Sequence, residues 1–92
     1  MAQEVTDNVE RSRYEFPVEG MLAFIDYRRS PGVVALTHAE VPAQLEGRGI
    51  GSRMVRAVLD AIRANGEKAI PHCSFVAAFV RRHPEYQDMI AR

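Results

Sequence analysis

The chain has 92 residues, of which 47% are hydrophobic and 26% are charged, a composition typical of a globular domain with one hydrophobic core. Twelve Lys and Arg residues balance twelve Asp and Glu residues, so no net field favours nucleic acid or an anionic membrane surface as a partner. We therefore expect a flexible N-terminus over residues 1–8 and a single domain over residues 9–92.

The sequence also predicts where the protein works. Residues 1–10 are polar and unlike a signal peptide, and no apolar run approaches the roughly 20 residues that span a bilayer. The single cysteine, Cys73, cannot form an internal disulfide, which suits a reducing compartment. We expect a cytoplasmic protein, a monomer or weak homodimer, without a metal site because its three histidines are scattered.

Alternating and apolar runs predict three strands in the first half of the chain. Residues 9–15 alternate loosely, which indicates an edge strand that ends at Pro17. Residues 21–28 are apolar on both alternating faces, as expected for a central strand. The Ser-Pro-Gly sequence at residues 30–32 favours a tight turn. Val33–Glu40 should then be a third strand, paired with the second as a hairpin.

An amphipathic helix is the clearest element of the second half. Its apolar residues recur at spacings that form one helical stripe, and they are Gly51, Met54, Val55, Val58, Leu59 and Ile62. Arg56 and Asp60 form an i,i+4 pair on the opposite face. Asn65 and Gly66 provide a good helix stop, since glycine suits the left-handed position after a helix.

A further strand and helix complete the expected fold. Residues 68–73 predict a short strand, and Ser74 should cap a helix over residues 75–82 that ends before Pro84. Residues 84–92 have room for one more turn. The order is β-β-β-α-β-α, an α+β fold with a mixed sheet. Its first three strands should be antiparallel, and its last two parallel through a right-handed crossover.

Three glycines alternate at Gly47, Gly49 and Gly51, directly before the predicted amphipathic helix. The first turn of a helix offers unpaired N–H groups and partial positive charge, so a backbone that a ligand can approach closely is suited to an anion. Ser52 and Arg48 add donors and charge. A plain strand-to-helix turn is the alternative. The spacing matches neither the Walker pattern nor the dinucleotide-binding fingerprint.

This segment resembles motif A of the GNAT superfamily of N-acetyltransferases, whose core pattern is Arg/Gln-x-x-Gly-x-Gly/Ala. Gly49 and Gly51 take the two small positions, with Ile50 between them. Residues 70–86 are similar to the signature of the minimal, single-domain branch of small acetyltransferases, with its Pro-x-Cys-x-Phe and His-Pro-Glu-Tyr elements. The resemblance covers residues 20–86.

The resemblance implies an acyl-CoA N-acyltransferase-like sheet that binds acetyl-CoA between its diverging third and fourth strands. Only residues 16–19 separate the first two strands, so the helices usual there are missing and the acceptor side should be open. The acceptor would be a primary amine on a small molecule or a protein lysine. The implied coenzyme-binding residues are Ala39, Glu40, Val41, Glu46, Gly47, Arg48, Gly49, Ile50, Gly51 and Ser52.

Three side chains are candidates for chemistry. Cys73 stands before a helix, whose N-terminus lowers a thiol pKa. It would protonate the departing thiolate or accept the acetyl group itself, and the alternative is an inert buried cysteine. His38 and Glu40 share one face of a strand and could deprotonate the incoming amine, or they form a solvent-facing pair. His83 more simply locks the C-terminal corner.

Two departures from the superfamily pattern keep other functions open. Glu46 occupies the first position of the motif, where Arg or Gln is usual, so main-chain N–H groups would hold the phosphates. The last helix offers Phe79, Val80 and Arg81 where many members carry a tyrosine acid. The alternatives to an enzyme are a catalytically silent module that binds or senses coenzyme A, and a protein-interaction domain that keeps only the fold.

Overall fold

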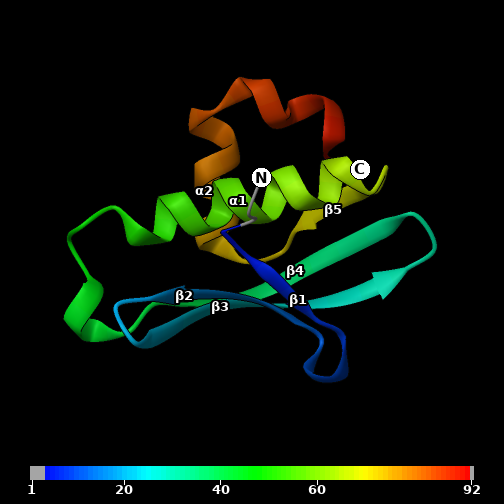
Figure 1. Cartoon of the computed structure of the whole chain (residues 1–92). Coiled ribbons are helices and arrows are strands. Elements are labelled where there is room, and N and C mark those ends of the chain that lie inside the picture. The colour runs from blue at the N-terminus through cyan, green and yellow to red at the C-terminus, as the bar shows by residue number, and fades with distance from the viewer. Residues whose placement is uncertain (1–3, 92) are drawn as a thin grey trace.

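A five-stranded sheet in the order β1-β2-β3-β4-β5 forms the base of the protein in the computed structural model, which describes residues 4–91 (Figure 1). The strands are β1 Thr6–Asn8, β2 Arg13–Val18, β3 Met21–Ser30, β4 Val33–Glu40 and β5 Lys68–Pro71. The α-helices are α1 Ile50–Ala64 and α2 Ser74–Arg82, and the 3₁₀ turns are η1 Val9–Arg11, η2 Ala43–Leu45 and η3 Pro84–Met89.

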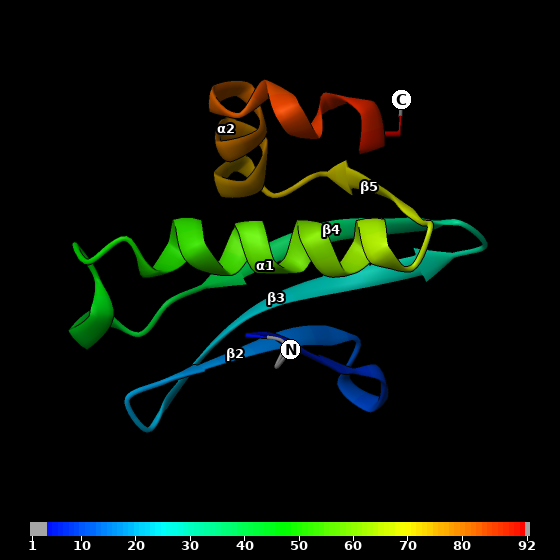
Figure 2. The ribbon, with the colours of Figure 1, turned by 45° about the horizontal axis from the view of Figure 1, so that its top comes forward.

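The sheet topology is the predicted mixed one. Strands β1 to β4 are antiparallel neighbours, and β5 pairs with β4 in parallel after α1 has crossed between them. Both α-helices lie on one side of the sheet (Figures 1 and 2). The fold is thus that of an acyl-CoA N-acyltransferase-like sheet, and no helix separates the strands β2 and β3.

The N-terminal region differs from the sequence prediction. The expected strand over residues 9–15 is divided, because the Asn8 side chain accepts a hydrogen bond from the Arg11 N–H and Ser12 turns the chain at φ 52°. Strand β1 therefore lies within the segment expected to be flexible, of which residues 1–3 fall outside the described part. Pro17 does not end its strand, which continues to Val18. The pairing of β1 with β2 stops at Glu15, so β1 has no residue opposite Pro17 that would need the N–H that proline lacks.

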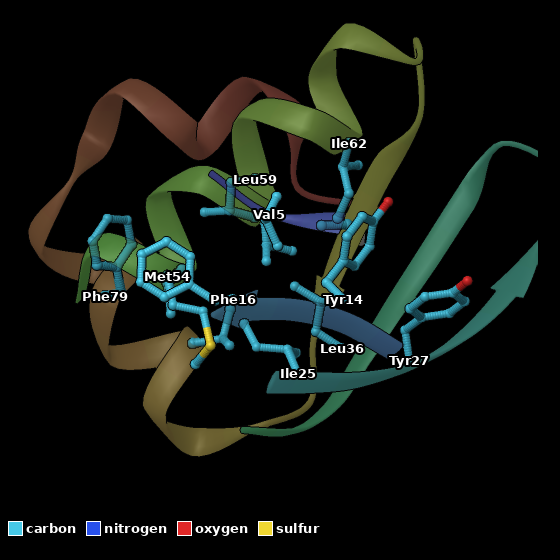
Figure 3. Packing of buried hydrophobic residues seen from close by; sticks show 14 of the residues in the cluster. Val5, Tyr14, Phe16, Ile25, Tyr27, Leu36, Met54, Leu59, Ile62 and Phe79 are labelled. Carbon is cyan, nitrogen blue, oxygen red and sulfur yellow. The ribbon is translucent and has the colours of Figure 1, made fainter. Parts of the chain in front are cut away.

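One hydrophobic core lies between the sheet and the helices (Figure 3). The predicted helical stripe is confirmed, since Met54, Val55, Val58, Leu59 and Ile62 are all fully buried. The sheet contributes Tyr14, Phe16, Ala23, Ile25, Tyr27, Val34, Leu36 and Ala69. Full burial of each large aliphatic or aromatic side chain stabilises the fold by roughly 1.5–3 kcal/mol before entropy is counted, so α1 is held by its stripe.

The ends of the C-terminal elements are shifted from their predicted positions. Strand β5 stops at Pro71 rather than at Cys73, because the His72 N–H bonds locally to the Ile70 carbonyl. Ser74 is the first residue of α2 and does not cap it; Cys73 holds the cap position, without a side-chain hydrogen bond. The predicted stop of α1 is confirmed, with Gly66 at φ 73°. The expected further turn is η3.

Candidate functional site

Strand β4 outlasts its partner β5, and this divergence creates the candidate site. The parallel ladder ends at Leu36↔Pro71, and the Cys73 N–H makes a last bond of 2.9 Å to the Leu36 carbonyl. On its other side β4 stays paired with β3 as far as Glu40, past a register shift that leaves Thr37 as an extra residue. Residues 37–40 therefore form a strand edge beyond the reach of β5.

A cavity of about 390 Å³ lies between this strand end and the start of α1. Its walls are Ala39, Val41, Leu45, Glu46, Gly47, Gly49, Ile50, Gly51, Ser52 and Phe75. The structure thus brings together eight of the ten residues named from the sequence as coenzyme-binding, and the two others are Glu40 and Arg48. A concave site of this size suits part of an extended cofactor.

The three glycines of the loop serve different purposes. Gly47 and Gly49 have φ of 79° and 73°, in the left-handed region that other residues adopt only with strain. Gly51 has no such φ. Glycine is needed there because a Cβ would lie only 2.7 Å from Cζ of Phe75. The loop is therefore shaped by backbone conformation at its first two glycines and by an aromatic ring at its third.

Helix α1 begins at the cavity without a side-chain cap. Gly49 holds the cap position and so offers no side-chain cap hydrogen bond, and the first turn contains no acidic residue. The first-turn N–H groups and the positive end of the helix dipole are suited to an anion. The side chain of Ser52, also in the wall, supplies a hydroxyl donor.

The charges near the loop are arranged unlike the sequence expectation. Nη1 of Arg48 donates to Oε1 of Glu19 at 3.0 Å, and Nη2 donates to Oε2, so the guanidinium is turned to the β2–β3 turn. This bond lowers the pKa of the Glu19 carboxyl. Glu46, by contrast, lies in the cavity wall. Since no arginine is among the residues that line the cavity, the donors in its wall are the main-chain N–H groups and the Ser52 hydroxyl.

The candidate catalytic side chains are not brought together in one cluster. His38 and Glu40 do share a face, with Nε2 of His38 3.2 Å from Oε1 of Glu40, and both are exposed. Since Ala39 and Val41 line the cavity, the alternation of the strand directs this pair to the other face of the sheet. Cys73 lies at the last β4–β5 link, partly buried against the core and outside the cavity wall.

Sequence reasoning missed Leu45 and Phe75 as residues of the cavity wall. Leu45 is buried because η2 turns the chain between β4 and the glycine loop. Phe75 sits next to Val76, which starts the buried stripe of α2, so its own side chain falls outside the stripe and stays 42% exposed. A large apolar residue off the buried face of a helix is the signal that could have found it.

The His-Pro-Glu-Tyr element locks the C-terminal corner, as predicted. The His83 ring stacks on Phe79 with centroids 4.0 Å apart. The Tyr86 hydroxyl donates to Oδ1 of Asp60 at 2.8 Å and accepts from Nη1 of Arg56 at 3.2 Å. Burial, with the Asp60 carboxylate, raises the pKa of Tyr86. The Tyr86 hydroxyl thus bridges Arg56 and Asp60, which the sequence suggested would pair directly.

Within residues 4–91, no group of three or more His, Cys, Asp or Glu side chains is placed to hold a metal ion. In the same residues, no helix has both the length and the apolar character needed to cross a membrane.

Comparisons with known proteins agree with this architecture. The NMR structure of a GCN5-like protein from Staphylococcus aureus, proposed to be an N-acetyltransferase, has a TM-score of 0.71 and 25% identity, covering 99% of this chain and 91% of that one. Protein NATD1 of Bos taurus is 35% identical over 52 residues, 56% of this chain and 46% of that protein. NATD1 of Gallus gallus is 35% identical over 52 residues, 56% and 47% respectively.

The chain thus spans about half the length of the curated relatives it matches. A family model for the GCN5-related N-acetyltransferase matches residues 13–89, which include every strand from β2 to β5, both α-helices and the whole glycine loop. With this match and the mixed sheet that diverges at β4, the chain belongs to the GCN5-related N-acetyltransferase family.

Proposed function

We propose that this protein is an acetyl-CoA-dependent N-acetyltransferase that transfers the acetyl group directly to a primary amine on a small molecule or a protein lysine. The observation that supports this most is the cavity that joins the free edge of β4 to the uncapped start of α1. The start of α1 suits an anionic group, and the free edge of β4 suits an extended chain with amides. Coenzyme A contains both.

Binding would rely on the main chain. The pyrophosphate would accept hydrogen bonds from the loop and the first turn of α1. The pantetheine arm would lie beside residues 37–40 like an added strand, with its amides bonded to the β4 edge. Because Glu46 is in the wall and Arg48 is bonded to Glu19, we expect moderate affinity with a shallow dependence on salt.

In the proposed reaction a neutral amine attacks the thioester carbonyl and a C–N bond forms. The tetrahedral intermediate collapses, the C–S bond breaks and the sulfur leaves as a thiolate. Cys73, at the β4–β5 divergence, donates its proton to this thiolate. The amine nitrogen, positive after the attack, loses a proton to solvent, and solvent returns a proton to Cys73, so protons balance. His38 and Glu40 have no role in this route, because they lie on the other face of the sheet from the cavity.

Two measurements test the proposal. Calorimetry with acetyl-CoA should give saturable binding, and Gly49→Asp, which adds a carboxylate at the start of α1, should abolish it. Mass spectrometry of amines and lysine peptides incubated with the protein and acetyl-CoA should reveal acetylated products. No binding at millimolar acetyl-CoA would refute the proposal.

A catalytically silent module that binds coenzyme A is the second candidate. Cys73, His38 and Glu40 lie outside the cavity wall and on different elements or faces, which favours binding without turnover. Cys73→Ala separates the two candidates. An enzyme that uses this thiol should lose turnover while retaining its affinity for coenzyme A. A binding module has no turnover to lose.

A further inference from the structure

Phe75 is an apolar side chain left uncovered beside the cavity. The structure leaves three large hydrophobic side chains exposed within residues 4–91, which are Val9, Leu22 and Phe75. Of these, Phe75 alone lines the cavity. It is 42% exposed and belongs to the first turn of α2. An exposed aromatic ring in the wall of a concave site is a surface that a ligand can cover favourably.

Gly51 of α1 sets the position of this ring. A Cβ at residue 51 would lie 2.7 Å from Cζ and 3.1 Å from Cε2 of Phe75, closer than side chains approach one another. The ring therefore occupies the volume that any other residue at 51 would need. Gly51 belongs to the first turn of α1 and Phe75 to the first turn of α2, so the ring lines the cavity where the two helices begin.

The ring is unsuited to phosphate. It has no hydrogen-bond donor, and the face of an aromatic ring carries partial negative charge that disfavours an anion. The phosphates belong with the N–H groups of the loop. Ala39 and Val41, at the end of β4, are also in the wall and are apolar. Together with the Phe75 ring they give the wall an apolar component, which suits a largely aliphatic chain.

We propose that Phe75 covers the pantetheine arm of the ligand and makes the site select coenzyme A thioesters over nucleotides that carry the same phosphates without the arm. Gly51 keeps the space in which the ring stands. This inference rests on the proposed binding of acetyl-CoA and extends it to a residue that determines specificity. It predicts that Phe75 contributes to affinity only when the ligand has an arm.

The experiment compares two ligands by calorimetry on the full chain. Coenzyme A carries the arm, and 3′-phospho-ADP carries the phosphates and adenosine without it. Phe75→Ala should weaken coenzyme A binding about ten-fold and 3′-phospho-ADP binding less than about two-fold, because covering the exposed ring is an apolar contribution. Phe75→Leu should lie between. Leu22→Ala is the matched control, being 38% exposed and outside the cavity wall, and should change neither.

A second set of variants tests the contact with Gly51. Gly51→Ala should weaken coenzyme A binding in the wild type because it displaces the ring. It should weaken binding much less in the Phe75→Ala background, where no ring is present. Additive losses would overturn the pairing. Thermal unfolding of each variant verifies that it is folded.

The possible failures are distinguishable. Equal losses for both ligands, or unchanged coenzyme A binding in Phe75→Ala, would overturn the specificity role and leave the proposed function standing. If the wild-type protein binds neither ligand, the proposed function fails and this inference fails with it.

Discussion

We predict that Gly49 is needed because its backbone has a left-handed conformation. Replacing it and measuring stability without a ligand separates this conformational role from any contact with the ligand. The residue has φ 73° and ψ 11°, and a Cβ there would meet no atom within 4 Å. The cost of Gly49→Ala is therefore conformational rather than steric. A non-glycine residue in the left-handed region costs roughly 1–2 kcal/mol. Asparagine tolerates this region and is a favourable helix cap, so Gly49→Asn should lose less than half of that amount.

Thermal unfolding followed by circular dichroism measures these differences, and urea unfolding gives the corresponding free energies. For a chain of this size, a loss of about 1 kcal/mol lowers the melting temperature by roughly 4–8 °C, well within resolution. The expected order of stability is wild type, then Gly49→Asn, then Gly49→Ala, in the absence of any ligand. Equal stability of all three would refute the conformational reasoning and would assign Gly49 to contact with the ligand alone.

Three further predictions concern contacts outside the cavity. Tyr86→Phe removes the hydroxyl that links α1 to η3 and should reduce the free energy of unfolding by about 1–2 kcal/mol without changing acetyl-CoA affinity. Glu19→Gln releases Arg48 from its partner and should tighten acetyl-CoA binding, with a steeper dependence on salt in calorimetry. Burial, together with the hydrogen bond to Asp7, raises the pKa of Tyr27 to about 12. Since this pKa is above its unfolded value near 10, the contribution of Tyr27 to stability is complete below pH 10 and is lost as the pH rises toward 12. A titration of phenolate absorbance, compared with that of the Asp7→Asn variant, tests this.

Much of the fold follows from periodicity within short segments. The stripe of α1 and the bounds of β4 were predicted from spacing and turn residues, and the structure confirms both. The N-terminal strand was wrong because a side-chain cap by Asn8 and a left-handed Ser12 interrupt a run that looked continuous. Such local turn chemistry competes with a weak alternating pattern and outweighs it.

The candidate site shows the same division. The glycine loop was recognisable from its position before an amphipathic helix, since helix starts and anion binding are local properties. The reason for each individual glycine could not be recognised from the sequence. It depends on φ at Gly47 and Gly49 and on the ring beside Gly51, which only the tertiary structure shows. The resemblance of residues 20–86 to the superfamily identified coenzyme A as the expected ligand, which spacing alone left open.

By itself, the sequence determined the α+β class, the βαβ unit and the location of the glycine loop proposed to bind an anion, since each depends on residues close together in the chain. Only the tertiary structure decided that Arg48 turns to Glu19, 29 positions earlier, and that Phe75 stands over Gly51. These contacts join segments separated by whole elements, and their geometry is set by how β4, α1 and α2 pack. Local periodicity carries no information about that packing.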